Sequence, residues 1–88
     1  MHHDLKILPQ YFQPVLDGRK TFEVRLDDRG FQAGDTVALH EYDTKRTNDA
    51  LRYTGRVLNA TIGYVTAYEQ RQGYVVFSLM NVLKRKAR

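Results

Sequence analysis

The chain has 88 residues and no cysteine, so it is one domain with a modest core, without disulfides or thiolate metal sites. Its net charge is +4, but residues 1–83 hold ten basic and ten acidic side chains, and the excess lies at positions 84, 85, 86 and 88. We therefore expect a single neutral domain over residues 1–83. Residues 84–88 are expected to form a basic tail that is disordered, with a phosphate-binding arm as the alternative.

The remaining bulk features concern the compartment of the protein. No apolar run reaches the roughly 18 residues of a membrane span, and the chain does not open on a leader pattern. The lack of cysteine is compatible with a reducing environment. We expect a cytoplasmic protein with no membrane partner.

The first third of the chain predicts a short strand followed by a helix. Residues 5–8 are a short apolar strand, and Pro9 suits the first position of a helix that extends to Asp17. Gly18 fits the left-handed residue that commonly ends a helix. Pro14 lies inside this segment, so we expect a kinked helix or two short turns. The buried stripe of the helix is predicted to be Tyr11, Phe12, Val15 and Leu16.

Residues 20–26 are predicted to form the second strand, with one apolar and one polar face. Phe22, Val24 and Leu26 alternate with Thr21, Glu23 and Arg25. The apolar face is expected to meet the core and the polar face to meet solvent.

The rest of the chain predicts three more strands. Residues 36–43 follow a Gly34-Asp35 turn, and the polar residues 44–52 form a surface loop. Residues 56–66 form a long strand in which Gly63 marks a bulge or bend. Residues 74–83 are apolar on both faces and predict the most buried strand, with Ser78 as a core hydroxyl.

These elements predict a mainly-β α+β domain. One short helix cannot cover both faces of an open five-stranded sheet, whereas a sheet that closes on itself has no exposed edges. The pattern therefore predicts a small β-barrel of about five strands with a helix over one mouth.

Gly18, Lys20, Glu23 and Arg25 form the pattern G-x-K-x-x-E-x-R, which resembles the signature of ASCH domains. These domains belong to the PUA-like superfamily of small, mostly RNA-associated barrels. The flanking segments resemble an ASCH-like family of bacterial and phage domains without an established activity, and the resemblance covers about residues 3–82. The supporting motifs are His3-x-Leu5-Lys6-Ile7-x-Pro9-x-Tyr11-Phe12, Asp28-Arg29-x-Phe31-x-x-Gly34-Asp35, Tyr53-Thr54-Gly55-Arg56 and Gly73-Tyr74-Val75-Val76. The resemblance implies a PUA-like pseudo-barrel.

The residues of the signature have two interpretations. From the pattern alone, Lys20 is an exposed lysine after a helix end, and Glu23 and Arg25 form an ion pair that could include Glu41 or Asp43. The resemblance implies instead a ligand cleft lined by Lys20, Glu23 and Arg25. The ligand-binding residues that we predict on this basis are Lys20, Thr21, Glu23, Arg25, His3, Arg29, Tyr42, Tyr53 and Arg56.

Three functions are compatible with such a cleft. Lysine and arginine suit phosphate oxygens and tyrosines can stack on bases, so the first is binding of RNA or of a modified nucleotide or nucleoside. The second is a hydrolase, because some ASCH proteins act on acetylcytidine and others are proposed ribonucleases. The third is binding of a protein partner, as in many small phage domains.

The hydrolase alternative assigns roles to particular residues. Glu23 would activate water, and Lys20 would act as an acid or oxyanion donor. The amidohydrolase-type site has a threonine at the position of Glu23, and Glu69 is the candidate for its distal glutamate. The three histidines have no metal-ligand spacing, so neither a metal nor another cofactor is expected.

Overall fold

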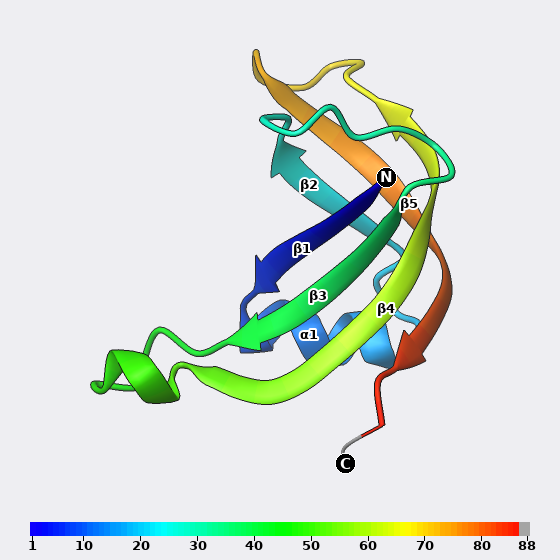
Figure 1. Cartoon of the computed structure of the whole chain (residues 1–88). Coiled ribbons are helices and arrows are strands. Elements are labelled where there is room, and N and C mark those ends of the chain that lie inside the picture. The colour runs from blue at the N-terminus through cyan, green and yellow to red at the C-terminus, as the bar shows by residue number, and fades with distance from the viewer. Residues whose placement is uncertain (87–88) are drawn as a thin grey trace.

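The structure is a computed structural model that describes residues 1–86, and it consists of one curved sheet with one helix (Figure 1). The mainly-β α+β fold is confirmed. A single turn of 3₁₀-helix, Asp49–Leu51, lies in the predicted surface loop. The elements in chain order are β1 (His2–Ile7), α1 (Pro9–Leu16), β2 (Phe22–Leu26), β3 (Thr36–Tyr42), β4 (Tyr53–Thr66) and β5 (Tyr74–Lys84).

The strands lie in the order β1-β3-β4-β5-β2. β1 runs parallel to β3, and the other neighbouring strands are antiparallel. The sheet curls into a half-barrel that brings its two edge strands, β1 and β2, toward one another (Figure 1). We call the gap between β1 and β2 the seam, because the two strands do not form a ladder of backbone hydrogen bonds in the described part of the chain.

The bend of the long strands is built around Gly63, as predicted. The pairing of β4 with β5 changes register between Ile62 and Val65. A Cβ atom on Gly63 would lie 2.7 Å from the Oγ of Ser78, so only glycine fits there without a shift of its neighbours. The Ser78 hydroxyl accepts the backbone N–H of Tyr64 at 2.9 Å. Ser78 is therefore half-buried at the bulge, and the prediction of a core hydroxyl was wrong.

α1 closes one end of the concave side of the sheet (Figure 1). It is one uninterrupted helix that includes Pro14, and Gly18 follows it with a φ of +79°. Phe12 and Val15 are buried in the core, but Tyr11 is 44% exposed, so the predicted stripe is only partly correct. No helix within residues 1–86 has the length and apolar character to cross a membrane.

β2 faces the opposite way from the prediction. Phe22, Val24 and Leu26 are 43%, 50% and 52% exposed, whereas Glu23 is only 4% exposed. No β2 side chain belongs to the buried apolar cluster of the described residues. Alternation shows that the two faces of a strand differ but not which of them is internal, because a shift of one residue exchanges the faces.

The strand with the largest buried fraction is β3 rather than β5. Residues 37–39 of β3 are fully buried, because this strand lies near the middle of the sheet. In β5, Val75, Phe77 and Leu79 are buried and alternate with half-buried side chains. β5 is therefore buried on one face only, although its sequence is apolar on both faces.

The end of β5 extends into the segment that the sequence predicts as a tail. Lys84 belongs to β5, and the backbone N–H of Arg85 donates to the carbonyl oxygen of Val57 at 2.8 Å. Residues 84 and 85 thus continue the pairing with β4. The last two residues of the predicted tail, 87 and 88, lie outside the described residues.

The orientation of β2 can be tested with two phenylalanines of opposite burial. Phe77 is fully buried and Phe22 is largely exposed. Phe77→Ala should lower the free energy of unfolding by about 3–5 kcal/mol, because the buried apolar ring is lost and a cavity remains in its place. Phe22→Ala, the matched control, should lower it by less than about 1 kcal/mol. Urea denaturation measures both values, and equal losses would contradict the observed facing of β2.

Candidate functional site

The centre of the candidate site is the Glu23 carboxylate, which lies between two cations. The Oε2 atom of Glu23 accepts a hydrogen bond from the Lys20 Nζ, with 2.5 Å between the two atoms. Its Oε1 atom accepts the Arg25 Nη2 at 2.7 Å and the Arg25 Nε at 3.2 Å. Lys20 also donates to the carbonyl oxygen of Phe22 at 2.7 Å. The structure thus brings together the three residues of the predicted triad, and Glu23 holds both cations in fixed positions.

Arginine side chains from the β2 side bridge the seam. The Nη2 atom of Arg25 donates to the carbonyl oxygen of Lys6 at 2.6 Å, and the Nη1 atom of Arg29 donates to that of Asp4 at 3.1 Å. Both carbonyls belong to β1, which among the described residues is an edge strand with no paired strand on that side. Two guanidinium groups therefore tie β1 to β2 where strand pairing would close a full barrel.

A cleft follows the seam and has two lobes that share Lys6 and Arg25. We call the first the triad lobe, which has a volume of about 510 Å³, and the second the tyrosine lobe, of about 720 Å³. The triad lobe is lined by Lys6, Ile7, Leu8, Tyr11, Lys20, Phe22, Glu23, Val24 and Arg25. The tyrosine lobe is lined by Asp4, Leu5, Lys6, Arg25, Arg29, His40 and Tyr53.

The charge of the cleft is positive. Lys6, Lys20, Arg25 and Arg29 stand against two carboxylates, which leaves an excess of two positive charges. One carboxylate is Glu23, whose two oxygens are already bonded to cations. Each lobe taken by itself also has more basic than acidic lining residues, which favours an anionic ligand.

Asp4 is the second carboxylate, and it lies in the tyrosine lobe. Its Oδ1 atom lies 3.0 Å from the His40 Nε2 and 3.4 Å from the His2 Nε2. The hydrogen bond with His40 is the main reason that the pKa of Asp4 lies below its ordinary value. Asp4 therefore carries its charge at neutral pH, with the His40 Nε2 within hydrogen-bond distance of its Oδ1.

Several donors in the cleft have no hydrogen bond within residues 1–86. They are the Nζ of Lys6, the Nη1 of Arg25 and the Nη2 of Arg29. Each of the three residues lies at the lobe junction or in the tyrosine lobe. These N–H groups can bind an oxygen-rich ligand without breaking an existing bond.

Aromatic rings lie beside both lysines of the cleft, Lys6 at the junction of the lobes and Lys20 in the triad lobe. The Lys6 Nζ lies 4.4 Å from the ring centroid of Tyr42 and 5.8 Å from that of Tyr53. The Lys20 Nζ lies 5.5 Å from Tyr11 and 4.9 Å from Phe22. Each lobe thus combines a cation with an aromatic surface that is partly open to solvent.

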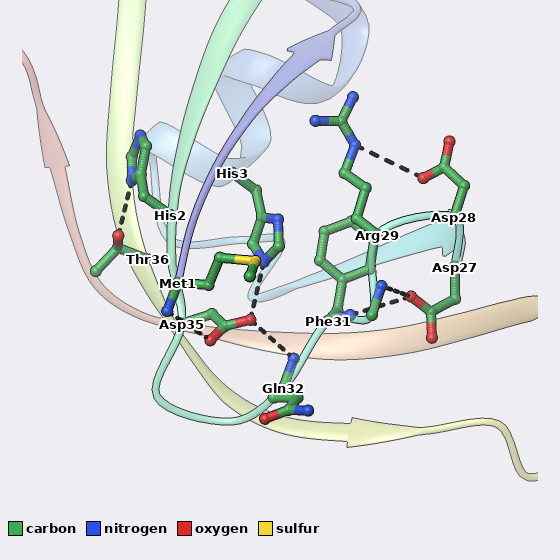
Figure 2. A network of polar contacts seen from close by, with 11 residues as sticks. Met1, His2, His3, Asp27, Asp28, Arg29, Phe31, Gln32, Asp35 and Thr36 are labelled. Carbon is green, nitrogen blue, oxygen red and sulfur yellow. Dashed lines mark hydrogen bonds and ion pairs between the residues drawn. The ribbon is translucent and has the colours of Figure 1, made fainter.

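His3 lies outside the cleft, in a buried network around Asp35 (Figure 2). The His3 Nε2 lies 2.8 Å from the Asp35 Oδ2, which also accepts the backbone N–H of Gln32 at 3.0 Å. The Met1 amino group donates to the Oδ1 at 3.1 Å. The hydrogen bond with His3, followed by that from Met1, lowers the pKa of Asp35 to about 2. This network joins β1 to the turn before β3, so a structural role accounts for His3.

Arg56 also lies outside the cleft, where it binds Glu41. Its Nε and Nη2 atoms each lie 3.0 Å from a Glu41 oxygen, and the guanidinium stacks 4.3 Å from the ring centroid of Phe12. The pKa of Glu41 lies below its ordinary value, chiefly because of the hydrogen bonds from Arg56. Glu41 is thus committed to Arg56 and is not a partner of the triad. Arg56 lines a separate basic hollow with Thr54, Gly55, Lys84, Arg85 and Lys86.

Two further predicted residues lie near the cleft without lining it. Thr21 is exposed, and Tyr42 contributes through its edge contact with Tyr53, at 4.8 Å between ring centroids. Glu69 lies exposed in the turn between β4 and β5 and lines neither lobe. The described residues hold no group of three or more histidine and acidic side chains that could bind a metal ion.

Sequence reasoning missed Lys6, Tyr11, Phe22 and His40 as lining residues. For Lys6 a signal existed, because alternation in β1 places it on the face opposite Leu5 and Ile7. That this face borders a cleft depends on β1 being an edge strand, which the order of strands decides. Phe22 was assigned to the core, because the apolar face of β2 was predicted to lie on the inside of the sheet.

The profile of the family described as "Domain of unknown function (DUF3850)" matches residues 2–79. The chain belongs to this family. The match includes every residue that lines the two lobes, so the seam cleft lies wholly within the DUF3850 domain.

A similar protein comes from Escherichia phage P2. The "Uncharacterized 12.9 kDa protein in GpA 3'region" is 39% identical over 64 residues, which are 73% of this chain. The match spans 53% of the phage protein, so this chain corresponds to about half of that relative. The resemblance to ASCH and PUA-like domains stays a prediction, because neither match names that superfamily.

The role of Glu23 as the centre of the triad predicts a loss of stability in Glu23→Gln. The neutral amide would leave Lys20 and Arg25 without a countercharge in a largely buried position. We expect the free energy of unfolding to fall by about 2 kcal/mol. Asp17→Asn removes an exposed partner of Arg19 and should cost much less than Glu23→Gln, because solvent screens the pair. Similar losses in both variants by urea denaturation would contradict the central role of Glu23.

The lowered pKa of Asp35 predicts a pH-dependent contribution to stability. An acid whose folded pKa is depressed stabilises the fold above its ordinary pKa, here 3.8, and loses that contribution as the pH falls toward about 2. Wild type should exceed Asp35→Asn in unfolding free energy at neutral pH, and the difference should shrink between about pH 4 and about pH 2. Denaturation at a series of pH values measures it, and a constant difference would contradict the prediction.

Proposed function

We propose that this domain binds single-stranded RNA, or a nucleotide with a modified base, in the seam cleft. The observation that carries the proposal is the combination of uncommitted cationic donors with aromatic rings in one continuous cleft. Phosphate oxygens accept such donors, and unpaired bases stack on aromatic side chains. The ligand would lie between β1 and β2, with Lys6 and Arg25 at the middle of its path.

The triad has a positioning role in this proposal. Because Glu23 fixes the Lys20 ammonium and the Arg25 guanidinium, both cations are placed before a ligand arrives. A fixed donor loses less conformational freedom on binding than a mobile surface side chain. Within residues 1–86 the Nη1 atom of Arg25 has no hydrogen bond and can serve the ligand, whereas its other donors remain bonded to Glu23 and β1.

The hydrolase alternative receives less support from the same geometry. A general base needs an oxygen that can accept a proton from water. Both oxygens of Glu23 already accept hydrogen bonds from Lys20 and Arg25, and the carboxylate is buried. The candidate base Glu23 and the candidate acid Lys20 are thus bonded to each other, and we therefore advance binding as the function.

The family relationship, the cellular location and the protein-partner alternative remain. A half-barrel of five strands with one helix is compatible with the predicted ASCH and PUA-like relationship, and we retain that relationship as a hypothesis. We propose a cytoplasmic location because RNA is the ligand. A protein partner, the remaining alternative, is the interpretation to which a negative RNA result would lead.

Fluorescence anisotropy with short single-stranded RNAs over a salt series tests the proposal. Lys6→Gln should weaken binding about tenfold and reduce the salt slope by about 0.7, as expected for one lost phosphate contact on a single strand. Lys45→Gln, in the exposed loop after β3, is the matched control and should bind like wild type. A similar loss of affinity in both lysine variants would contradict binding in the seam cleft.

A second pair of charges separates the cleft from the basic hollow at the end of β5. The double variant Lys84→Gln and Lys86→Gln removes two charges from that hollow. If it loses affinity while Lys6→Gln does not, phosphates are held outside the seam cleft and the proposed site is wrong. If none of the RNAs binds to the wild-type protein or to any variant at low salt, the proposed function itself is wrong.

A further inference from the structure

The two lobes of the cleft point to the size and kind of the ligand. We propose that the seam cleft binds one dinucleotide step of single-stranded RNA, with one base in each lobe and the connecting phosphodiester at their junction. This inference rests on the proposed function and makes it more specific. It follows from three observations on the junction and the two lobes.

The junction of the lobes is cationic. Lys6 and Arg25 are the residues that line both lobes. They come from opposite sides of the seam and are joined by the hydrogen bond between Arg25 and the Lys6 carbonyl oxygen, at 2.6 Å. The Lys6 Nζ and the Arg25 Nη1 both retain free donors within residues 1–86. A phosphodiester at this point would receive donors from both strands.

The tyrosine lobe provides a held aromatic surface. Tyr53 is 50% exposed, and the edge contact with Tyr42 at 4.8 Å supports its ring. His40 makes a second edge contact with Tyr53, at 6.4 Å between centroids. Supported rings that remain half open to solvent suit base stacking, since little side-chain freedom is lost on binding.

The triad lobe provides a second aromatic surface of a different kind. Tyr11 and Phe22 are 44% and 43% exposed, and the Lys20 ammonium lies near both rings. The lobe is also lined by aliphatic side chains, Ile7, Leu8 and Val24. A base can therefore be stacked and surrounded by apolar atoms here, whereas in the tyrosine lobe it meets mainly charged and polar neighbours.

The sizes of the lobes agree with one nucleotide in each. Their volumes of about 510 Å³ and 720 Å³ both lie within the range of roughly 300–1,000 Å³ that is typical of small-molecule sites. A mononucleotide would fill one lobe and place its phosphate at the junction. The second lobe would then remain empty, and its aromatic surface would contribute nothing to affinity.

Calorimetric titration of adenosine monophosphate and of the dinucleoside monophosphate ApA tests the inference. The phosphodiester of ApA has less charge than the monoester, so electrostatics alone favours the mononucleotide. We expect ApA to bind at least about tenfold more tightly because of the second stacked base. Tyr53→Ala should remove this advantage and lower the affinity for ApA at least about tenfold. Tyr64→Ala, an exposed tyrosine of β4 that lines neither lobe, is the matched control and should change neither affinity.

The possible failures can be distinguished. If adenosine monophosphate binds as tightly as ApA, and Lys6→Gln weakens both, the seam cleft binds nucleotides but the dinucleotide inference is wrong. The inference is equally wrong if Tyr53→Ala and Tyr64→Ala reduce the affinity for ApA to the same extent. If neither ligand nor any single-stranded RNA binds, the proposed function is wrong and the inference falls with it.

Discussion

The hydrogen bond that Arg25 makes across the seam, held by its bonds to Glu23, is the constraint on which the candidate site depends. The guanidinium reaches from β2 to the Lys6 carbonyl oxygen on β1, and Glu23 holds it in that position. The Arg29 guanidinium makes a second tie, to the Asp4 carbonyl oxygen of β1 at 3.1 Å. The Arg25 guanidinium also presents to the cleft a donor, Nη1, that has no hydrogen bond within residues 1–86. One side chain therefore contributes both to the shape of the site and to its positive charge. Glu23 is therefore internal for an electrostatic reason, although alternation in β2 alone would equally permit an apolar interior.

Much of the fold was predictable because it depends on local sequence. Gly18 ends α1 with a left-handed backbone, and Gly63 is required where β4 bends against Ser78, so both positions were readable from residue type. The number of strands followed from alternation and turn residues. The inward face of β2 was not predictable, because it depends on which strands lie at the edges of the sheet. That order is set by contacts between residues far apart in the chain, such as the parallel pairing of β1 with β3.

The candidate site was predictable in its centre and not in its extent. Lys20, Glu23 and Arg25 occur together in one short motif, and the structure places them in direct contact. Lys6 and Tyr53 come from distant strands and approach the motif only when the sheet curls. His3 and Arg56 share the charge and polarity of ligand-binding residues, but each is bonded to a buried carboxylate, Asp35 or Glu41. Sequence alone does not distinguish a basic side chain that pairs with a buried carboxylate from one that is available to bind a ligand.

The arginine and lysine contacts at the seam also bear on self-association. Edge strands with free carbonyl and amide groups are templates for the strands of other molecules, and proteins commonly block them with charged side chains. Here Arg25 and Arg29 occupy two acceptors on β1, and Lys20 occupies the Phe22 carbonyl oxygen on β2. The outward row of apolar side chains on β2 would otherwise make that edge a site for intermolecular sheet growth. A half-barrel that leaves two edges unpaired can thus resist aggregation, because the side chains that line its cleft already occupy backbone groups that a foreign strand would need.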